Sequence, residues 1–393
     1  MGATEKVLHS FAGGSDGAYP DGILFDASGN IFGVTNTGGN DECGTQLSAG
    51  CGVVFEMTPN QGSWSESVIH VFDQSTDGGN PYALLVMDAS GNLSGCNLYY
   101  GPHGTGSVFQ LAPSGGSWSE TILGTFPTVN DGLSCDGLVL DPAGHLFGVT
   151  AAGGKNNEGL VFQFIPKTGG KWKEAVRYSF MGGNNDGTAP EAPPIFYPPS
   201  KKRDVIYGTT FEGGPHLAGT VFEMQKIKGK WTETPIYFFQ GLPFGTSTDG
   251  TNPTASVVFD HAGNLYGTTD YGGAAGVGAV YELSPNGQGG WTESVLYEFT
   301  DGADGGHPSA LIIDDAGNLY GVTSGHNTFG SVYELSPPTG GGAWTFTVLY
   351  DFKGGADGGG GGGALLRDAS GNLYGTTTYG GAHNLGVVYE VTP

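Results

Sequence analysis

Charged residues are scarce in this sequence, and basic residues are the scarcest. Lys and Arg together number 14 against 38 Asp and Glu, which gives a formal net charge of −24. The one tight basic run is Lys201-Lys202-Arg203, and no basic stripe exists that could follow a phosphate backbone. Nucleic acid is therefore excluded as a partner, whereas cations and neutral polymers are favoured.

Long hydrophobic runs and familiar catalytic motifs are also missing. No run of 18 apolar residues occurs, so the sequence predicts no membrane span. The start, Met1-Gly2-Ala3-Thr4, lacks the charged and apolar regions of a signal peptide, as a mature domain would. No nucleophile motif, H-E-x-x-H, phosphate loop or dinucleotide fingerprint is present.

Glycine is abundant, with 75 of the 393 residues, and it accompanies a repeated text. The stretch GNLYGTT occurs at Gly263–Thr269 and again at Gly371–Thr377. Related stretches begin at Gly29, Gly91, Gly144, Val205 and Gly317. Six Trp residues recur with the same period, at intervals of 53 to 60 residues. The sequence therefore contains seven copies of one unit.

Each copy contains four short strand patterns and no helical period. In the copy from Asp304 to Phe352, apolar or β-branched runs cover 310–313, 319–323, 331–335 and 344–352, separated by Gly-rich or Pro-rich turns. A glycine recurs inside the second strand, where it usually marks a close backbone approach. Seven such units predict an all-β fold, a seven-bladed β-propeller with four antiparallel strands per blade.

The two ends of the chain complement each other. The last copy stops after its third strand, whereas residues 4–11, TEKVLHSF, match the fourth-strand text TESVLYEF at 292–299. We therefore expect the N-terminal strand to close the ring. The predicted architecture is one domain, 1–393, with repeats at approximately 12–72, 73–126, 127–180, 181–239, 240–299, 300–352 and 353–393 plus 3–11.

The repeat text D-G…P…L-x-x-D-x-x-G-N-L-Y-G-T-T…G-G…G-x-V-Y-E-L-x-P resembles the GloVer (Gloeobacter–Verrucomicrobia) tandem repeat of bacterial choice-of-anchor surface proteins. Copies five to seven carry the resemblance most specifically. Copy four departs from it, with 197–204 replacing the D-x-x-G-N turn, and copy two has Ser94, Cys96 and Asn97 in the motif. The resemblance implies an exported protein and brings no established activity.

In a propeller whose first strand is innermost, the inter-blade loops and the loops between second and third strands share one face. This face is the default ligand site. Every inter-blade loop has an Asp-Gly pair, which is either a repeated turn former or a set of calcium ligands. The aspartates are Asp16, Asp77, Asp131, Asp186, Asp249, Asp304 and Asp357.

Three acids directly precede first strands, and we expect them to rim the channel. They are Asp21, Asp136 and Glu191, each followed by a small residue. Carboxylates that lie close together favour a bound cation or raised pKa values, so these three are candidate metal ligands, with calcium the candidate ion. The alternative is that they are separate, solvated carboxylates.

The loops between second and third strands carry His, Tyr and Asp side chains of the kind that bind sugars. These candidate ligand-binding residues are Tyr99, His103, His216, Asp270, Tyr271, His326, Tyr379 and His383. Exposed loop residues without a ligand are the alternative interpretation.

The four cysteines predict two disulfides. Cys43 and Cys51 bracket one long loop, whereas Cys96 and Cys135 occupy neighbouring blades on the same face.

Three functions stay open at this point. The first is a monomeric surface module that binds a glycan or a cell-wall polymer. The second is a polysaccharide hydrolase or lyase, with Asp136, Glu191 and Glu212 as candidate catalytic residues. The third is a structural spacer without a ligand.

Overall fold

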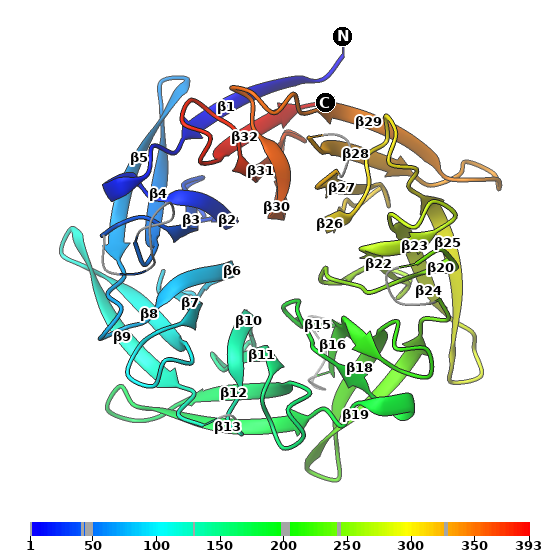
Figure 1. The fold of residues 1–393 in the computed structure, drawn as a ribbon, viewed down its shortest axis with the longest axis horizontal. Coiled ribbons are helices and arrows are strands. Elements are labelled where there is room, and N and C mark those ends of the chain that lie inside the picture. Colours follow the sequence, from blue (N-terminus) through cyan, green and yellow to red (C-terminus); the bar gives the residue numbers. More distant parts are fainter. Residues whose placement is uncertain are drawn as a thin grey trace.

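Seven four-stranded antiparallel sheets surround a central channel in the computed structural model (Figure 1). The structure describes residues 2–40, 43, 50–128, 130–197, 205–241, 245–325 and 329–393. The first strand of each blade is innermost and the fourth is outermost. The all-β, seven-bladed propeller is confirmed.

The blades follow one another along the chain. Blade 1 contains β2 (Ala18–Phe25), β3 (Ile31–Thr37), β4 (Val53–Asn60) and β5 (Ser63–Val71). Blade 2 contains β6 (Gly79–Met87), β7 (Leu93–Tyr99), β8 (Ser107–Ser114) and β9 (Ser117–Thr125). Blade 3 contains β10 (Leu133–Leu140), β11 (Leu146–Ala152), β12 (Leu160–Pro166) and β13 (Trp172–Ser179).

Blades 4 and 5 have shortened inner strands. Blade 4 contains β15 (Ile195–Phe196), β16 (Val205–Thr210), β18 (Thr220–Ile227) and β19 (Lys230–Phe238). Blade 5 contains β21 (Val258–Phe259), β22 (Leu265–Thr269), β24 (Ala279–Pro285) and β25 (Trp291–Glu298). Two small ladders accompany them, β14 (Gly187–Thr188) with β17 (Glu212–Gly213) and β20 (Ser247–Thr251) with β23 (Tyr271–Gly273). Two short 3-10 turns cover Gly14–Asp16 and Gly183–Asn185.

Blade 7 is assembled from both ends of the chain. Blade 6 contains β26 (Pro308–Ile313), β27 (Leu319–Thr323), β28 (Ser331–Ser336) and β29 (Thr345–Asp351). Blade 7 contains β30 (Gly359–Arg367), β31 (Leu373–Tyr379), β32 (Val387–Thr392) and β1 (Thr4–Ser10). The register of β1 against β32 runs from Thr4 opposite Thr392 to Ser10 opposite Val387. The expected closure by the N-terminal strand is confirmed.

The recurring glycine of the second strand faces an aromatic ring on the third strand of its own blade. Gly33, for example, pairs with Phe55, and Gly321 pairs with Tyr333. The same pairing occurs in the other five blades, Gly95 with Phe109, Gly148 with Phe162, Gly208 with Phe222, Gly267 with Tyr281 and Gly375 with Tyr389. The close approach predicted at these glycines is therefore mainly that of a side-chain ring.

The D-x-x-G-N text forms a rigid turn between the first and second strands. Asp26 Oδ1 accepts hydrogen bonds from the backbone N–H groups of Ser28 and Asn30, both at 2.8 Å. The Asn30 amide donates to Asp26 Oδ2 at 2.9 Å. These turns lie at the ends of the strands opposite the long loops, so the repeated D-x-x-G-N residues stabilise the fold.

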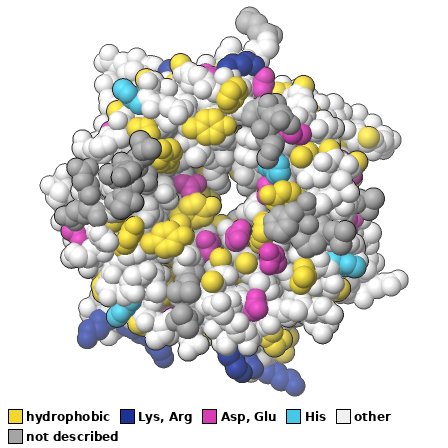
Figure 2. All heavy atoms as spheres, in the orientation of Figure 1, with side chains coloured by type: hydrophobic (Ala, Val, Ile, Leu, Met, Phe, Trp, Pro, Cys, Tyr) yellow, Lys and Arg dark blue, Asp and Glu magenta, His cyan; other side chains and the backbone are white. Residues whose placement is uncertain are grey.

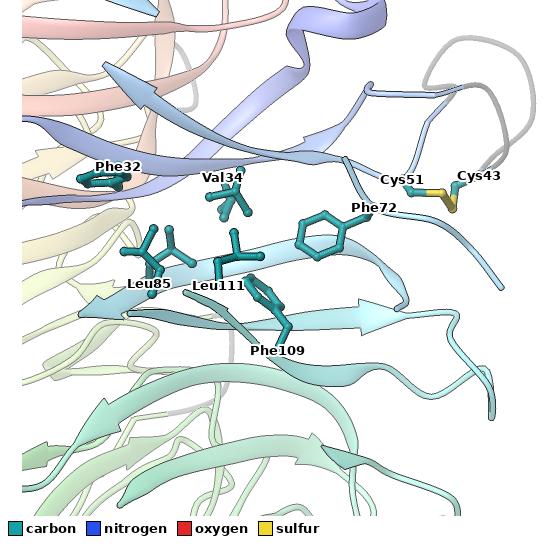
Figure 3. Packing of buried hydrophobic residues seen from close by; sticks show 10 residues of the cluster. Phe32, Val34, Cys43, Cys51, Phe72, Leu85, Phe109 and Leu111 are labelled. Atoms are coloured by element: carbon teal, nitrogen blue, oxygen red, sulfur yellow. A yellow bond between two sulfur atoms is a disulfide. The ribbon is translucent and has the colours of Figure 1, made fainter. Parts of the chain in front are cut away.

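Both predicted disulfides are present, and they account for all four cysteines. Cys43–Cys51 lies beside the buried side chains between blades 1 and 2, including Phe72 and Phe109 (Figure 3). Cys96–Cys135 connects β7 of blade 2 to β10 of blade 3. Two disulfides indicate an oxidising, exported environment. Among the described residues, no helix is long and apolar enough to cross a membrane.

Candidate functional site

Six of the seven blades present one side chain to the central channel, on the innermost strand or shortly before it. In blades 1, 2, 3 and 6 the residue just before this channel-facing residue pairs with a residue near the end of the second strand. Pro20, for example, pairs with Thr35, and Cys135 pairs with Thr150. We call these side chains the channel ring; they are Asp21, Tyr82, Asp136, Glu191, Thr254 and Ser309, and the backbone of Gly363 in blade 7 lines the same cavity. All seven line one cavity of about 320 Å³. The structure therefore places the three predicted acids in one cavity, but their carboxylate oxygens do not all lie within 4.8 Å of one another.

Asp21 is held firmly in this ring. Its Oδ2 accepts a hydrogen bond from the backbone N–H of Ala83 in the next blade at 3.2 Å. Burial in the narrow channel raises the pKa of Asp21, and backbone hydrogen bonds from Ala83, Gly363 and Gly22 oppose that rise.

Asp136 and Glu191 lie on blades 3 and 4 and influence each other. The Asp136 side chain is buried, and its Oδ2 accepts the backbone N–H of Ala151 at 2.7 Å. Burial, together with the charge of Glu191, raises the pKa of Asp136 to about 8. Burial, with smaller contributions from Glu212 and Asp270, raises the pKa of Glu191 to about 7. Near neutral pH both groups are therefore partly protonated and can donate as well as accept hydrogen bonds.

A second cavity, of about 310 Å³, continues from the channel toward the loops. Tyr82, Asp136, Glu191 and Thr254 line both cavities, so the two are adjacent. Tyr82 is 41% exposed there, and Tyr99, at the end of β7, is 51% exposed. Figure 2 shows several acidic side chains around this central opening. We call this second cavity the channel mouth.

Asp270 of blade 5 and His307, which directly precedes β26 of blade 6, form a His–Asp pair. Asp270 Oδ1 lies 3.2 Å from His307 Nδ1, and the ring of Tyr271 packs edge-on against His307 with 5.1 Å between centroids. The hydrogen bond to Asp270 raises the pKa of His307. Because Glu212 and Asp270 also act on Glu191, the negative charge is concentrated on blades 3 to 5.

The structure does not gather the predicted loop histidines. His103, His216 and His383 are exposed on their own loops and line neither channel cavity. Tyr379 is half-buried and packs over Gly359 and Gly360. His326 lies outside the described residues.

Four residues near the channel escaped the sequence analysis, namely Tyr82, Thr254, Ser309 and His307. A signal for the first three was present, because each follows a proline at the position that Asp21 and Glu191 occupy in their copies. His307 directly precedes such a proline, but no pattern in the sequence predicts that it lies beside Asp270.

Metal chemistry at the channel would rest on carboxyl groups alone. Asp21, Asp136 and Glu191 offer the oxygen donors that calcium prefers. Their raised pKa values mean that a cation would compete with protons for them. The Asp-Gly aspartates make hydrogen bonds within their loops and to the preceding fourth strand; Asp186 Oδ2, for example, accepts bonds from Tyr178 Oη at 2.8 Å and from the N–H of Met181 at 2.7 Å.

Several solved structures are similar to this chain at low sequence identity. A gluconolactonase from Xanthomonas campestris is 12% identical, with 81% of this chain and 86% of that chain covered and a TM-score of 0.42. A putative glucose dehydrogenase from Thermus thermophilus is 13% identical, with full coverage of both chains and a TM-score of 0.47. A protein of unknown function from Dyadobacter fermentans is 12% identical, with 99% of each chain covered and a TM-score of 0.49.

No curated protein matches the chain significantly. The family described as the Gloeobacter/Verrucomicrobia repeat, in contrast, matches residues 45–242 and 200–393. These two matches span most of the propeller, and the chain therefore belongs to the Gloeobacter/Verrucomicrobia repeat family.

Proposed function

We propose that this propeller is a cell-surface binding module whose channel mouth takes a neutral, hydroxyl-rich ligand, most simply the terminal sugar of a glycan or cell-wall polymer. One observation carries the proposal: two exposed tyrosines, Tyr82 and Tyr99, lie in the same cavity as two carboxyl groups, Asp136 and Glu191. Disulfides and family membership support an exported location, and attachment through a separate anchor is part of this proposal.

The chemistry of the channel mouth suits sugars in two ways. Tyrosine rings provide the flat apolar faces on which sugar rings stack. Partly protonated carboxyl groups can donate a hydrogen bond to one hydroxyl oxygen and accept one from another. A net charge of −24 disfavours polyanionic ligands, so a neutral glycan is preferred.

The size of the space favours a short ligand. The mouth is about 310 Å³ and the channel cavity below it about 320 Å³, at the small end of the range for small-molecule sites. A terminal sugar unit could enter this space, whereas a long polymer segment would have to lie across the loops.

A glycan-array screen followed by calorimetric titration of the hits tests the proposal. Tyr99→Ala should weaken binding at least tenfold while changing stability by less than about 0.5 kcal/mol, because the side chain is exposed. Tyr379→Ala is the matched control, since Tyr379 ends β31 as Tyr99 ends β7 but lies outside the mouth. Equal affinity of wild type and Tyr99→Ala would reject the site, and a screen without hits would favour a spacer.

A second candidate function follows from the two carboxyl groups themselves. Asp136 and Glu191 have raised pKa values in one cavity, and paired carboxyl groups of this kind perform glycoside hydrolysis. Release of reducing ends from a bound glycan, lost in Asp136→Asn, would favour a hydrolase over a binding module. Intact glycan after prolonged incubation would favour binding alone.

A further inference from the structure

Two histidine-containing triads lie far from the channel, at contacts between neighbouring blades. We call such a contact an outer seam: the fourth strand and following loop of one blade against the fourth strand of the next. His9 on β1, Asp16 and Glu66 on β5 meet at the seam between blades 7 and 1. His70 on β5, Asp77 and Glu120 on β9 meet in the same way between blades 1 and 2.

The donor atoms of each triad converge on a small space. Within the described part of the chain, these are the two groups whose three ligand atoms lie within 4.8 Å of one another. His70 Nε2 lies 3.0 Å from Asp77 Oδ2 and 3.5 Å from Glu120 Oε1. Ligands around a tetrahedral zinc ion, with bonds of 2.0–2.1 Å, lie about 3.3 Å apart, so only small adjustments are needed.

The glutamate of each triad has one buried oxygen, Oε1 of Glu66 and of Glu120, that makes no hydrogen bond among the described residues, although Glu120 Oε1 lies 3.5 Å from His70 Nε2. A cation would offset the cost of burying such an oxygen. The glutamates at four seams without histidine have the same buried Oε1, so the imidazole is what sets these two seams apart. The Asp77 side chain is only 5% exposed, and those of His70 and Glu120 are 18% and 21% exposed, so an ion could still reach the site.

The other seams show that the fold itself does not require histidine at this position. In four of them a tyrosine hydroxyl bonds the loop aspartate, as Tyr178–Asp186 and Tyr237–Asp249 at 2.8 Å, Tyr297–Asp304 at 3.0 Å and Tyr350–Asp357 at 2.9 Å. A tyrosine therefore satisfies the aspartate without offering a good metal ligand. The histidines at two seams add an imidazole nitrogen to the same two carboxyl groups.

We propose that the His9–Asp16–Glu66 and His70–Asp77–Glu120 triads each bind one divalent transition-metal ion of the zinc type. One nitrogen and two carboxylate oxygens form a three-residue ligand set, which leaves a fourth position for water. The imidazole separates these sites from calcium, which binds oxygen ligands. Each ion would link the outer strands of two blades, and the sites are independent of the channel mouth.

Zinc titration of the full, chelator-treated chain at pH 7 tests the proposal, with calcium in parallel. We expect about two zinc ions per chain in calorimetry and no comparable calcium binding at these sites. His70→Tyr, which copies the seam found in four other places, should reduce the count to one. His9→Tyr combined with His70→Tyr should abolish zinc binding and any zinc-dependent rise in melting temperature.

Two further variants make the test specific. His216→Ala removes an exposed loop histidine and should leave the count at two. Tyr178→His should raise it to three, because Glu233 lies beside Tyr178 and Asp186. If circular dichroism shows that a tyrosine variant is misfolded, Glu66→Gln and Glu120→Gln replace it, and each should likewise remove one zinc ion per chain.

Three results would overturn the proposal. The first is a wild-type chain that binds no zinc, which would mean that a shared proton alone neutralises the carboxyl pair. The second is a zinc count that stays at two in the double histidine variant. The third is a count of two in Tyr178→His, which would show that the imidazole does not complete the site.

Discussion

The glycine of each second strand and the ring opposite it act as one unit. A Cβ atom at Gly321 would overlap the Tyr333 ring, so the ring needs a residue with no side chain opposite it. Four copies place Phe in this position, whereas Tyr281, Tyr333 and Tyr389 carry a hydroxyl that is buried without a hydrogen-bond partner among the described residues. These three hydroxyls therefore contribute a desolvation cost that the phenylalanine copies avoid.

Tyr333→Phe is accordingly expected to stabilise the protein, by about 1 kcal/mol, since it removes an unpartnered polar group and keeps the ring. Gly321→Ala, made as its counterpart, should destabilise by about 1–3 kcal/mol through overpacking. Chemical denaturation monitored by tryptophan fluorescence measures both. A lower stability for Tyr333→Phe would mean that the hydroxyl has a partner after all.

The sequence predicted the repeat, the strands and the ring closure, because each depends on short local patterns of turn residues and apolar residues. It also predicted Asp21, Asp136 and Glu191 at the channel, since equivalent positions on innermost strands converge at a small radius. The same reasoning does not bring His103, His216 and His383 together, and their role in ligand binding stays a prediction. Their shared text places them at equivalent positions on different blades, where the larger radius keeps them apart, and the Asp270–His307 contact depends on packing between blades.

At the scale of strands, the outer seams contain a recurring buried carboxyl group. Six fourth-strand glutamates have an Oε1 that is buried without a hydrogen-bond partner among the described residues, namely Glu5, Glu66, Glu120, Glu174, Glu233 and Glu293. Blade 6 has Phe346 instead, stacked on Tyr297 with 4.1 Å between centroids, beside Asp304. A seam can therefore form without the glutamate.

Glu233 makes the stability of its seam depend on pH. Burial, reinforced by the charge of Asp186 and opposed by the nearby Tyr178 hydroxyl, raises its pKa from 4.5 to about 8. Because the folded state holds this proton more tightly than the unfolded chain does, the contribution of Glu233 is fully present below pH 4.5 and is lost as the pH rises to about 8.

Glu233→Gln should therefore reduce the fall in melting temperature between pH 5 and pH 9, since glutamine resembles the protonated glutamate and does not titrate. Circular dichroism melts at pH 5, 7 and 9 measure this effect. Glu298→Gln, at an exposed position of the neighbouring fourth strand, is the control and should melt as the wild type does. Identical pH profiles for Glu233→Gln and wild type would contradict the assignment.

For the whole molecule, ring closure depends on one strand pairing. Deleting residues 1–11 removes β1 and leaves β32 as an open edge next to blade 1. We expect a sharply lower melting temperature and concentration-dependent association, seen by calorimetry and size-exclusion chromatography. A synthetic peptide of residues 2–11 should restore part of the stability, whereas an unchanged melting temperature would show that closure contributes little.

Blade 7 also sets an order of events during biosynthesis. The ribosome makes β1 hundreds of residues before β32, at about 5–20 residues per second, so β1 waits roughly 20–80 s for its partner. Six blades can form before that time, but the ring stays open until the last of its strands has been made. The β1–β32 pairing therefore acts as a test of completeness, because a prematurely terminated chain keeps a frayed edge that a protease or chaperone can recognise.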